Sequence, residues 1–123
     1  MSQKNILIVD DDESLLDIAS RALSKAGFHT ARASDFEQLE ALVDSYKPDL
    51  VLMDVHMPEL FGDDVAVILR DSRGIKAPIY LYSSLDSAEL ASRAAEAQLD
   101  GYISKNEGIS HLVTRVSEIL GGD

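Results

Sequence analysis

The residues best suited to chemistry are acidic, and three of them stand together. The stretch LIVDDDE, residues 7–13, runs from an apolar segment directly into Asp10, Asp11 and Asp12. Two carboxylates about 4 Å apart repel by roughly 4 kcal/mol at an effective dielectric constant near 20, so bringing them together requires a bound cation or a solvated edge. An aspartate can also cap the first N–H groups of a helix, and we assign that role to Asp12.

Further polar residues follow three other apolar segments. Asp54 ends DLVLMD, Ser83 and Ser84 follow IYLY, and Lys105 follows GYIS. If these segments are parallel strands, their carboxyl ends lie at the edge of the sheet where such folds bind ligands. Carboxylates and a hydroxyl suit a hard divalent cation, and Mg²⁺ is favoured because it keeps water molecules and accepts phosphate oxygens. With Asp54 and Lys105 at that edge, a metal site is favoured over a solvated edge.

This set of groups is arranged for phosphoryl transfer to one of its own carboxylates. A divalent cation and an ammonium group neutralise charge on the transferred group, while a hydroxyl donates to one of its oxygens. Asp54 is then the nucleophile, and Ser83 and Lys105 assist it.

The apolar pattern predicts the elements that must position these residues. Continuous apolar strands are typical of a parallel sheet covered on both faces, and apolar residues at helical spacing separate them. We expect strands at 5–9, 28–33, 49–54, 79–83 and 101–105, and helices at about 15–26, 35–46, 63–70, 87–97 and 109–120. On the fourth strand, Tyr80 and Tyr82 are expected to pack or to face the following helix. Such alternation implies an α/β fold, a doubly wound parallel sheet with helices on both faces.

Composition narrows the class of protein. A chain of 123 residues with 46% hydrophobic and 27% charged residues is ordinary for one globular domain. The formal net charge of −11 argues against direct binding of nucleic acid or an anionic membrane. There is no cysteine, no signal-like start and no apolar run of membrane-spanning length, so we expect a cytoplasmic protein.

Together the motifs resemble the response-regulator receiver domain of two-component signalling. LIVDDD, DLVLMDVHMP, LYSS and GYISK occur in this order over essentially the whole chain. The resemblance implies one receiver domain over residues 1–123, with a flavodoxin-like five-stranded sheet of order 2-1-3-4-5 and five helices. A chemotaxis member of this family is a standard example of that strand order.

The resemblance also assigns a phosphorylation site and a metal site. Asp54 is the phosphoacceptor, and Asp10 and Asp11 form the acidic pair. Asp10, Asp11, Asp54 and the backbone carbonyl of His56 are the implied Mg²⁺ ligands. The His56 imidazole either modulates hydrolysis of the phosphoryl group or faces solvent.

A second group of residues is implied to sense phosphorylation. Ser83 matches the switch hydroxyl, Tyr102 the aromatic residue that changes rotamer with it, and Lys105 the phosphate-binding lysine. An ordinary half-buried strand aromatic is the alternative for Tyr102. Ser84 stands where alanine is usual and adds a hydroxyl, and Leu85 flanks the phosphoryl pocket, so both are expected to modulate the reaction.

In addition to Ser84, two positions depart from the commonest family pattern. Asn106 follows the lysine, where many receivers have a proline in a cis peptide bond. A cis bond before a residue other than proline costs about 3 kcal/mol, so we predict a trans bond here. Gln98 replaces the usual glycine at the end of the fourth helix.

The resemblance implies protein partners and a signalling switch, not an enzyme acting on other substrates. A histidine kinase or histidine phosphotransfer protein would dock near the first helix, around Leu15 and Ile18. Phosphorylation would shift a pre-existing equilibrium on the face formed by the fourth helix, fifth strand and fifth helix, where a downstream protein target binds. The chain would be a monomer or a weak phosphorylation-linked dimer, and its only catalysis would be its own phosphoryl transfer and autodephosphorylation.

Several alternatives stay open. The chain could be a phosphorelay intermediate or phosphate sink, a degenerate receiver that only binds partners, or the receiver part of a larger regulator with a DNA-binding output domain. A haloacid-dehalogenase-type phosphatase also uses a strand-end aspartate with Mg²⁺. That class has an acid/base aspartate two residues after the nucleophile, where this chain has His56.

Overall fold

The computed structural model describes residues 3–43, 45–55, 62–72 and 74–121. Its strands are β1 (Asn5–Val9), β2 (His29–Ala33), β3 (Leu50–Met53), β4 (Ile79–Ser83) and β5 (Gly101–Ser104). Its helices are α1 (Glu13–Lys25), α2 (Phe36–Val43), α3 (Gly62–Ser72), α4 (Ser87–Glu96), a 3₁₀ turn η1 (Lys105–Glu107) and α5 (Ile109–Ile119). The predicted alternation of strand and helix is confirmed, and η1 is an addition to it.

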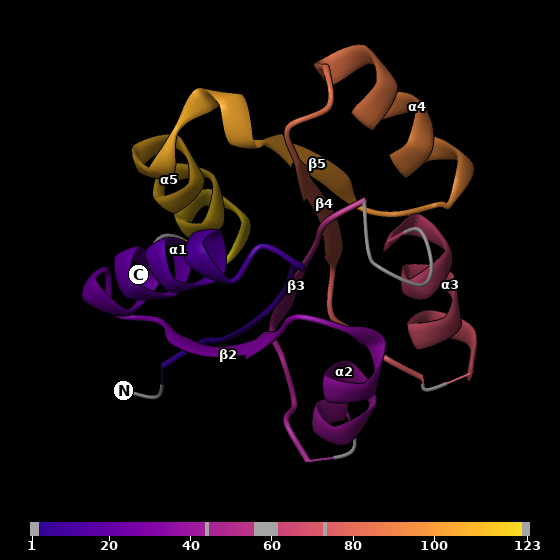
Figure 1. Ribbon diagram of the computed structural model, residues 1–123, viewed down its shortest axis with the longest axis horizontal. Coiled ribbons are helices and arrows are strands. Elements are labelled where there is room, and N and C mark those ends of the chain that lie inside the picture. The colour runs from indigo at the N-terminus through magenta and orange to yellow at the C-terminus, as the bar shows by residue number, and fades with distance from the viewer. Residues whose placement is uncertain (1–2, 44, 56–61, 73, 122–123) are drawn as a thin grey trace.

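The five strands form one parallel sheet in the order β2-β1-β3-β4-β5. Figure 1 shows α1 and α5 on one face of this sheet and α2, α3 and α4 on the other. The predicted doubly wound, flavodoxin-like architecture is therefore confirmed. In the described part of the chain, no helix has the length and apolar character needed to cross a membrane.

The core has two layers because the strand side chains alternate. Ile6 and Ile8 pack in the cluster under α1 and α5, whereas Leu7 and Val9 pack in the cluster under α2, α3 and α4. All four are at most 1% exposed. Burying each such side chain contributes about 1.5–3 kcal/mol, so β1 holds both helical layers to the sheet.

Aspartate side chains fix where three helices begin. The carboxylates of Asp12, Asp35 and Asp86 accept the backbone N–H three residues later at 3.2, 2.8 and 2.9 Å, respectively. These hydrogen bonds satisfy N–H groups that have no partner within the helix. The predicted cap at Asp12 is confirmed, and the start of α1 places Asp10 and Asp11 outside the helix, directly after β1.

Two of the departures from the family pattern, Gln98 and Asn106, concern the backbone. Gln98 has a φ of 57°, so it adopts the left-handed conformation for which glycine is the ordinary residue. All peptide bonds within the described residues are trans, which confirms the trans bond predicted before Asn106.

Candidate functional site

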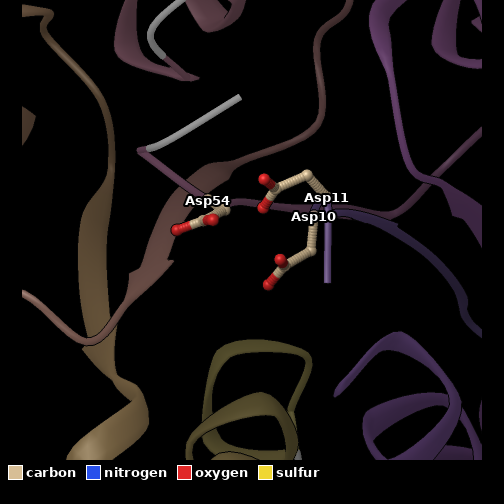
Figure 2. Close-up of side chains that lie close together, drawn as sticks. All are labelled: Asp10, Asp11 and Asp54. Carbon is tan, nitrogen blue, oxygen red and sulfur yellow. The ribbon is translucent and has the colours of Figure 1, made fainter. Parts of the chain in front are cut away.

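Three carboxylates meet at the carboxyl edge of the sheet. Val9 and Met53 are partners in the register of β1 and β3, so Asp10 and Asp54 follow neighbouring strands at the same level. One carboxylate oxygen from each of Asp10, Asp11 and Asp54 lies within 4.8 Å of the other two. Figure 2 shows the three side chains side by side. The predicted convergence of these aspartates is therefore seen in the structure.

The sheet itself holds two of these aspartates in place. The N–H of Asp10 donates to the Ala33 carbonyl at 3.0 Å, and the N–H of Asp54 donates to the Val9 carbonyl at 2.9 Å. The strand ladder thus extends to the aspartates themselves. Asp10 is 2% and Asp54 6% exposed, whereas Asp11 faces solvent.

Lys105 brings a positive charge to the buried carboxylates from the end of β5. Its ammonium nitrogen forms an ion pair with Oδ2 of Asp10 and lies 3.7 Å from Oδ1 of Asp54. Its side chain is only 14% exposed. Buried charges are costly unless they are paired, and Lys105 gives both carboxylates a counter-charge.

The chemistry of this donor set fits a hard divalent cation. The other oxygen of Asp10 accepts the N–H of Asp12 at 2.9 Å, which fixes the orientation of the carboxylate. Among the described residues, three carboxylates lie beside one ammonium, which leaves an excess of negative charge, and the ligand atoms that the carboxylates offer are oxygens. Oxygen ligands and negative charge are what Mg²⁺ and Ca²⁺ require.

The end of β4 places a buried hydroxyl next to an exposed turn. Ser83 is 1% exposed, and its Oγ accepts the N–H of Leu85 at 3.4 Å. Ser84 is exposed, and its carbonyl accepts a hydrogen bond from the side-chain amide of Asn106 at 3.0 Å. Leu85 packs against the core layer under α2, α3 and α4.

Tyr102 lies on a different surface from the carboxylates. It is half-buried on β5, packs against the same core layer, and lines a cavity of about 460 Å³ between α4, β5 and α5. Ser87, Ser104, Glu107 and Arg115 also line this cavity. The structure thus places Tyr102 on the face where sequence reasoning expected a partner to bind.

Tyr82 is a neighbour of the site that sequence reasoning treated only as a packing residue. It is 2% exposed and packs in the layer under α1 and α5, so the expected packing is confirmed, on the face of the sheet opposite α4. Its ring centroid lies 5.6 Å from the ammonium of Lys105. Burial, followed by the negative charge of Asp10, raises the pKa of Tyr82 to about 12.

His56 was predicted to provide a metal-binding carbonyl and to modulate hydrolysis. It lies outside the described residues, which break between 55 and 62. Within the described residues, the contacts beside the site that sequence reasoning missed are that of the Tyr82 ring with the Lys105 ammonium and that of the Asn106 amide with the Ser84 carbonyl. Strand alternation puts Tyr80 and Tyr82 on one face of the sheet without indicating which layer they enter, and the reach of Asn106 to the β4–α4 turn has no sequence signal.

The chain is similar in sequence to proteins of one known family. A model of the response regulator receiver domain matches residues 6–117. The chain is 31% identical over 121 residues to the phosphate regulon transcriptional regulatory protein PhoB of Pseudomonas aeruginosa, covering 98% of this chain and 53% of that protein. It is 35% identical over 114 residues to the DNA-binding response regulator MtrA of Mycobacterium leprae, covering 93% of this chain and 50% of that protein. The chain therefore spans about half the length of these curated relatives.

Solved structures agree with the sequence matches. A CheY-like response regulator receiver domain protein from Methanospirillum hungatei has a TM-score of 0.85 at 26% identity, covering 98% of this chain and 95% of that one. The receiver domain of the Francisella response regulator 1452 also has a TM-score of 0.85, at 27% identity, covering 97% of this chain and 98% of that one. Fold, acidic pocket and sequence thus lead to one conclusion: the chain belongs to the family of response regulator receiver domains, the signalling switches of two-component systems.

Proposed function

We propose that Asp54 accepts a phosphoryl group from a histidine kinase or a histidine phosphotransfer protein, and that this modification switches the binding of a downstream protein. The observation that carries the proposal is the meeting of Asp54 with two further carboxylates and the Lys105 ammonium at one edge of the sheet. Receiver domains as a family pair with such phosphoryl donors, and the particular donor belongs to the proposal.

Mg²⁺ is the proposed cofactor. Asp10, Asp11 and Asp54 would hold it through carboxylate oxygens, together with the backbone carbonyl of His56. When bound, the ion supplies positive charge that offsets charge on the transferred phosphoryl group.

The reaction proposed for the chain's own residues is a displacement at phosphorus. A carboxylate oxygen of Asp54 forms the new P–O bond, and the electrons of the breaking P–N bond stay with the donor histidine. The Lys105 ammonium, which is shared between Asp10 and Asp54, is placed to move toward the phosphoryl oxygens. The oxygen of Ser83 accepts the Leu85 N–H, so its proton is available to donate to the same group.

The proposed switch couples this site to the surface around Tyr102. Ser83 and Ser104 are register partners on β4 and β5. A shift of the backbone at Ser83 would therefore displace β5, the strand that carries Tyr102. Tyr102 would change rotamer within the cavity between α4, β5 and α5, and a downstream protein would bind that face. Ser84, Leu85 and the His56 imidazole would modulate the lifetime of the phosphoryl group.

The phosphoryl donor would dock on α1 around Leu15 and Ile18, and Ile18 is 50% exposed. Residues 1–123 would act as one cytoplasmic receiver unit, a monomer or a weak phosphorylation-linked dimer, that hydrolyses only its own acyl phosphate. Binding to nucleic acid or membrane is not part of its action, in keeping with the net charge of −11.

A second candidate is that this receiver controls a DNA-binding output domain. The relatives PhoB and MtrA are named as a transcriptional regulator and a DNA-binding regulator, and both are about twice as long as the stretch that this chain matches.

A role as phosphorelay intermediate or phosphate sink is a further alternative. Rapid return of the phosphoryl group to a histidine phosphotransfer protein would distinguish this role from a switch that binds a downstream protein.

Intact mass after incubation with acetyl phosphate, with and without Mg²⁺, tests the central proposal. Wild type should gain one phosphoryl group only with Mg²⁺, and Asp54→Asn should gain none. Asp71→Asn, an exposed aspartate on α3, is the matched control and should label like wild type. Labelling of Asp54→Asn at the wild-type rate would refute Asp54 as the acceptor.

A further inference from the structure

The loop after β5 is tied to the loop after β4 by one side chain, that of Asn106. Its side-chain amide donates to the Ser84 carbonyl at 3.0 Å, across a sequence separation of 22 residues. Its own backbone N–H donates to Oγ of Ser104 at 3.2 Å. Asn106 is thus anchored through its backbone to β5 and through its side chain to the turn that follows β4.

The two loops that Asn106 joins both carry groups of the phosphorylation site. Lys105 is its immediate neighbour and reaches the carboxylates of Asp10 and Asp54. Ser83 precedes Ser84, and its hydroxyl is held within the same turn by the N–H of Leu85. A displacement of either loop relative to the other would therefore change the separation of the lysine and the hydroxyl.

We propose that Asn106 is a positioning residue for phosphoryl transfer, which sets the turn at Ser83 and Ser84 against Lys105 so that both groups meet the phosphoryl oxygens together. The inference rests on the function proposed above for Asp54. Asn106 does not touch the reacting atoms, and it acts through the carbonyl of Ser84, by holding the neighbouring Ser83 hydroxyl at a fixed position relative to Lys105. A hydrogen bond of this kind fixes geometry that otherwise has to be reached during the reaction.

The chain provides a matched control at the opposite end of the sheet. The side-chain amide of Asn5, at the start of β1, donates to the Lys47 carbonyl at 3.1 Å, across 42 residues. Both bonds are exposed, both run from an asparagine amide to a backbone carbonyl, and both join segments distant in sequence. Replacing either asparagine by alanine removes the same kind of contact, so the two variants should have similar unfolding free energies.

The test is the rate of labelling by acetyl phosphate with saturating Mg²⁺, followed by intact mass. Asn106→Ala should label about 3- to 10-fold more slowly than wild type, the factor expected for one lost positioning hydrogen bond, whereas Asn5→Ala should stay within about twofold. Equal labelling rates for the two alanine variants would overturn the inference. Absence of labelling in wild type would instead overturn the proposed function, so the two failures are distinguishable.

A second readout separates positioning from general stability. In a Ser83→Ala background the hydroxyl that Asn106 helps to place is gone, so Asn106→Ala should slow labelling there by less than about twofold. The same slowing in both backgrounds would mean that Asn106 does not act through Ser83, and would refute the mechanism. If Asn106 had a purely structural role, the fold-reductions in labelling rate caused by Asn106→Ala and Ser83→Ala would multiply in the double variant.

Discussion

The ammonium of Lys105 lies 3.7 Å from a carboxylate oxygen of Asp54 and is at the same time paired with Asp10. One cation is therefore shared by two buried anions that directly follow the neighbouring strands β1 and β3. The stability of the fold should therefore depend on Lys105.

Replacing Lys105 by methionine should destabilise the fold by about 3 kcal/mol in the absence of a divalent cation, because two buried carboxylates lose the positive charge of Lys105. Addition of Mg²⁺ should recover part of this loss. Urea unfolding with and without Mg²⁺ measures both effects. Lys76→Met, at an exposed lysine, is the control and should change stability by less than about 0.5 kcal/mol. Equal stabilities of the two variants would show that the ion pairs contribute nothing.

Mg²⁺ should stabilise the wild-type fold, and Asp11→Asn should weaken this stabilisation. At a concentration 100 times the dissociation constant, a ligand of the folded state stabilises it by about 2.7 kcal/mol. Asp11 is the exposed member of the carboxylate cluster, so its replacement leaves the core intact while it removes one charge. Thermal unfolding across a Mg²⁺ titration, with Asp71→Asn as control, checks this. If Mg²⁺ raised the unfolding temperature of Asp11→Asn as much as that of wild type, Asp11 would not be a ligand of the ion.

Gln98→Gly should stabilise the protein by about 0.5–1 kcal/mol, because a left-handed conformation strains any residue with a Cβ. The φ of Gln98 is 57°, and its carbonyl accepts a hydrogen bond from Arg70 at 2.9 Å. That bond uses only backbone atoms of residue 98, so glycine retains it. The free energy of unfolding in urea measures the gain, with Gln98→Ala as comparison. A glycine variant less stable than the alanine variant would contradict the strain argument.

Tyr82 makes stability depend on pH in the alkaline range. The fold raises the pKa of Tyr82 from its ordinary 10.0 to about 12, mainly through burial. The folded state thus holds the phenol proton more tightly than the unfolded state. The resulting stability is fully present below about pH 10 and is lost as pH rises toward about 12, by on the order of 2–3 kcal/mol.

Tyr82→Phe keeps the ring and removes the titrating hydroxyl, so it isolates this effect. Between about pH 9 and about pH 11.5, its unfolding free energy should fall less than that of wild type. Urea unfolding at the two pH values gives the comparison. Parallel losses in the two proteins would show that Tyr82 does not titrate differently in the folded and unfolded states.

The sheet and the carboxylate cluster were predictable because they depend on short, strong patterns. Continuous apolar runs define buried parallel strands, and polar residues at their ends must then share one edge, which brings Asp10 and Asp54 together. The glycine-like conformation of Gln98 could be anticipated from its place at the end of a helix. These features depend on local sequence or on topology alone.

Other features depend on side-chain reach, which no pattern encodes. Alternation places Tyr80 and Tyr82 on one face of the sheet, but helices cover both faces, so the sequence does not say which layer they enter. The bond from Asn106 to the Ser84 carbonyl joins two loops whose separation is set by the finished fold. The 3₁₀ turn η1, which presents both Lys105 and Asn106, has no periodic apolar pattern of its own.

The ion pair of Lys105 with Asp10 spans 95 residues of sequence. A chain emerging from the ribosome exposes Asp10 and Asp54 long before the lysine that balances them. Until β5 docks at the edge of the sheet, Asp10 and Asp54 lack the positive charge of Lys105. The order of synthesis therefore delays the pairing of Asp10 with Lys105 until residue 105 has been made.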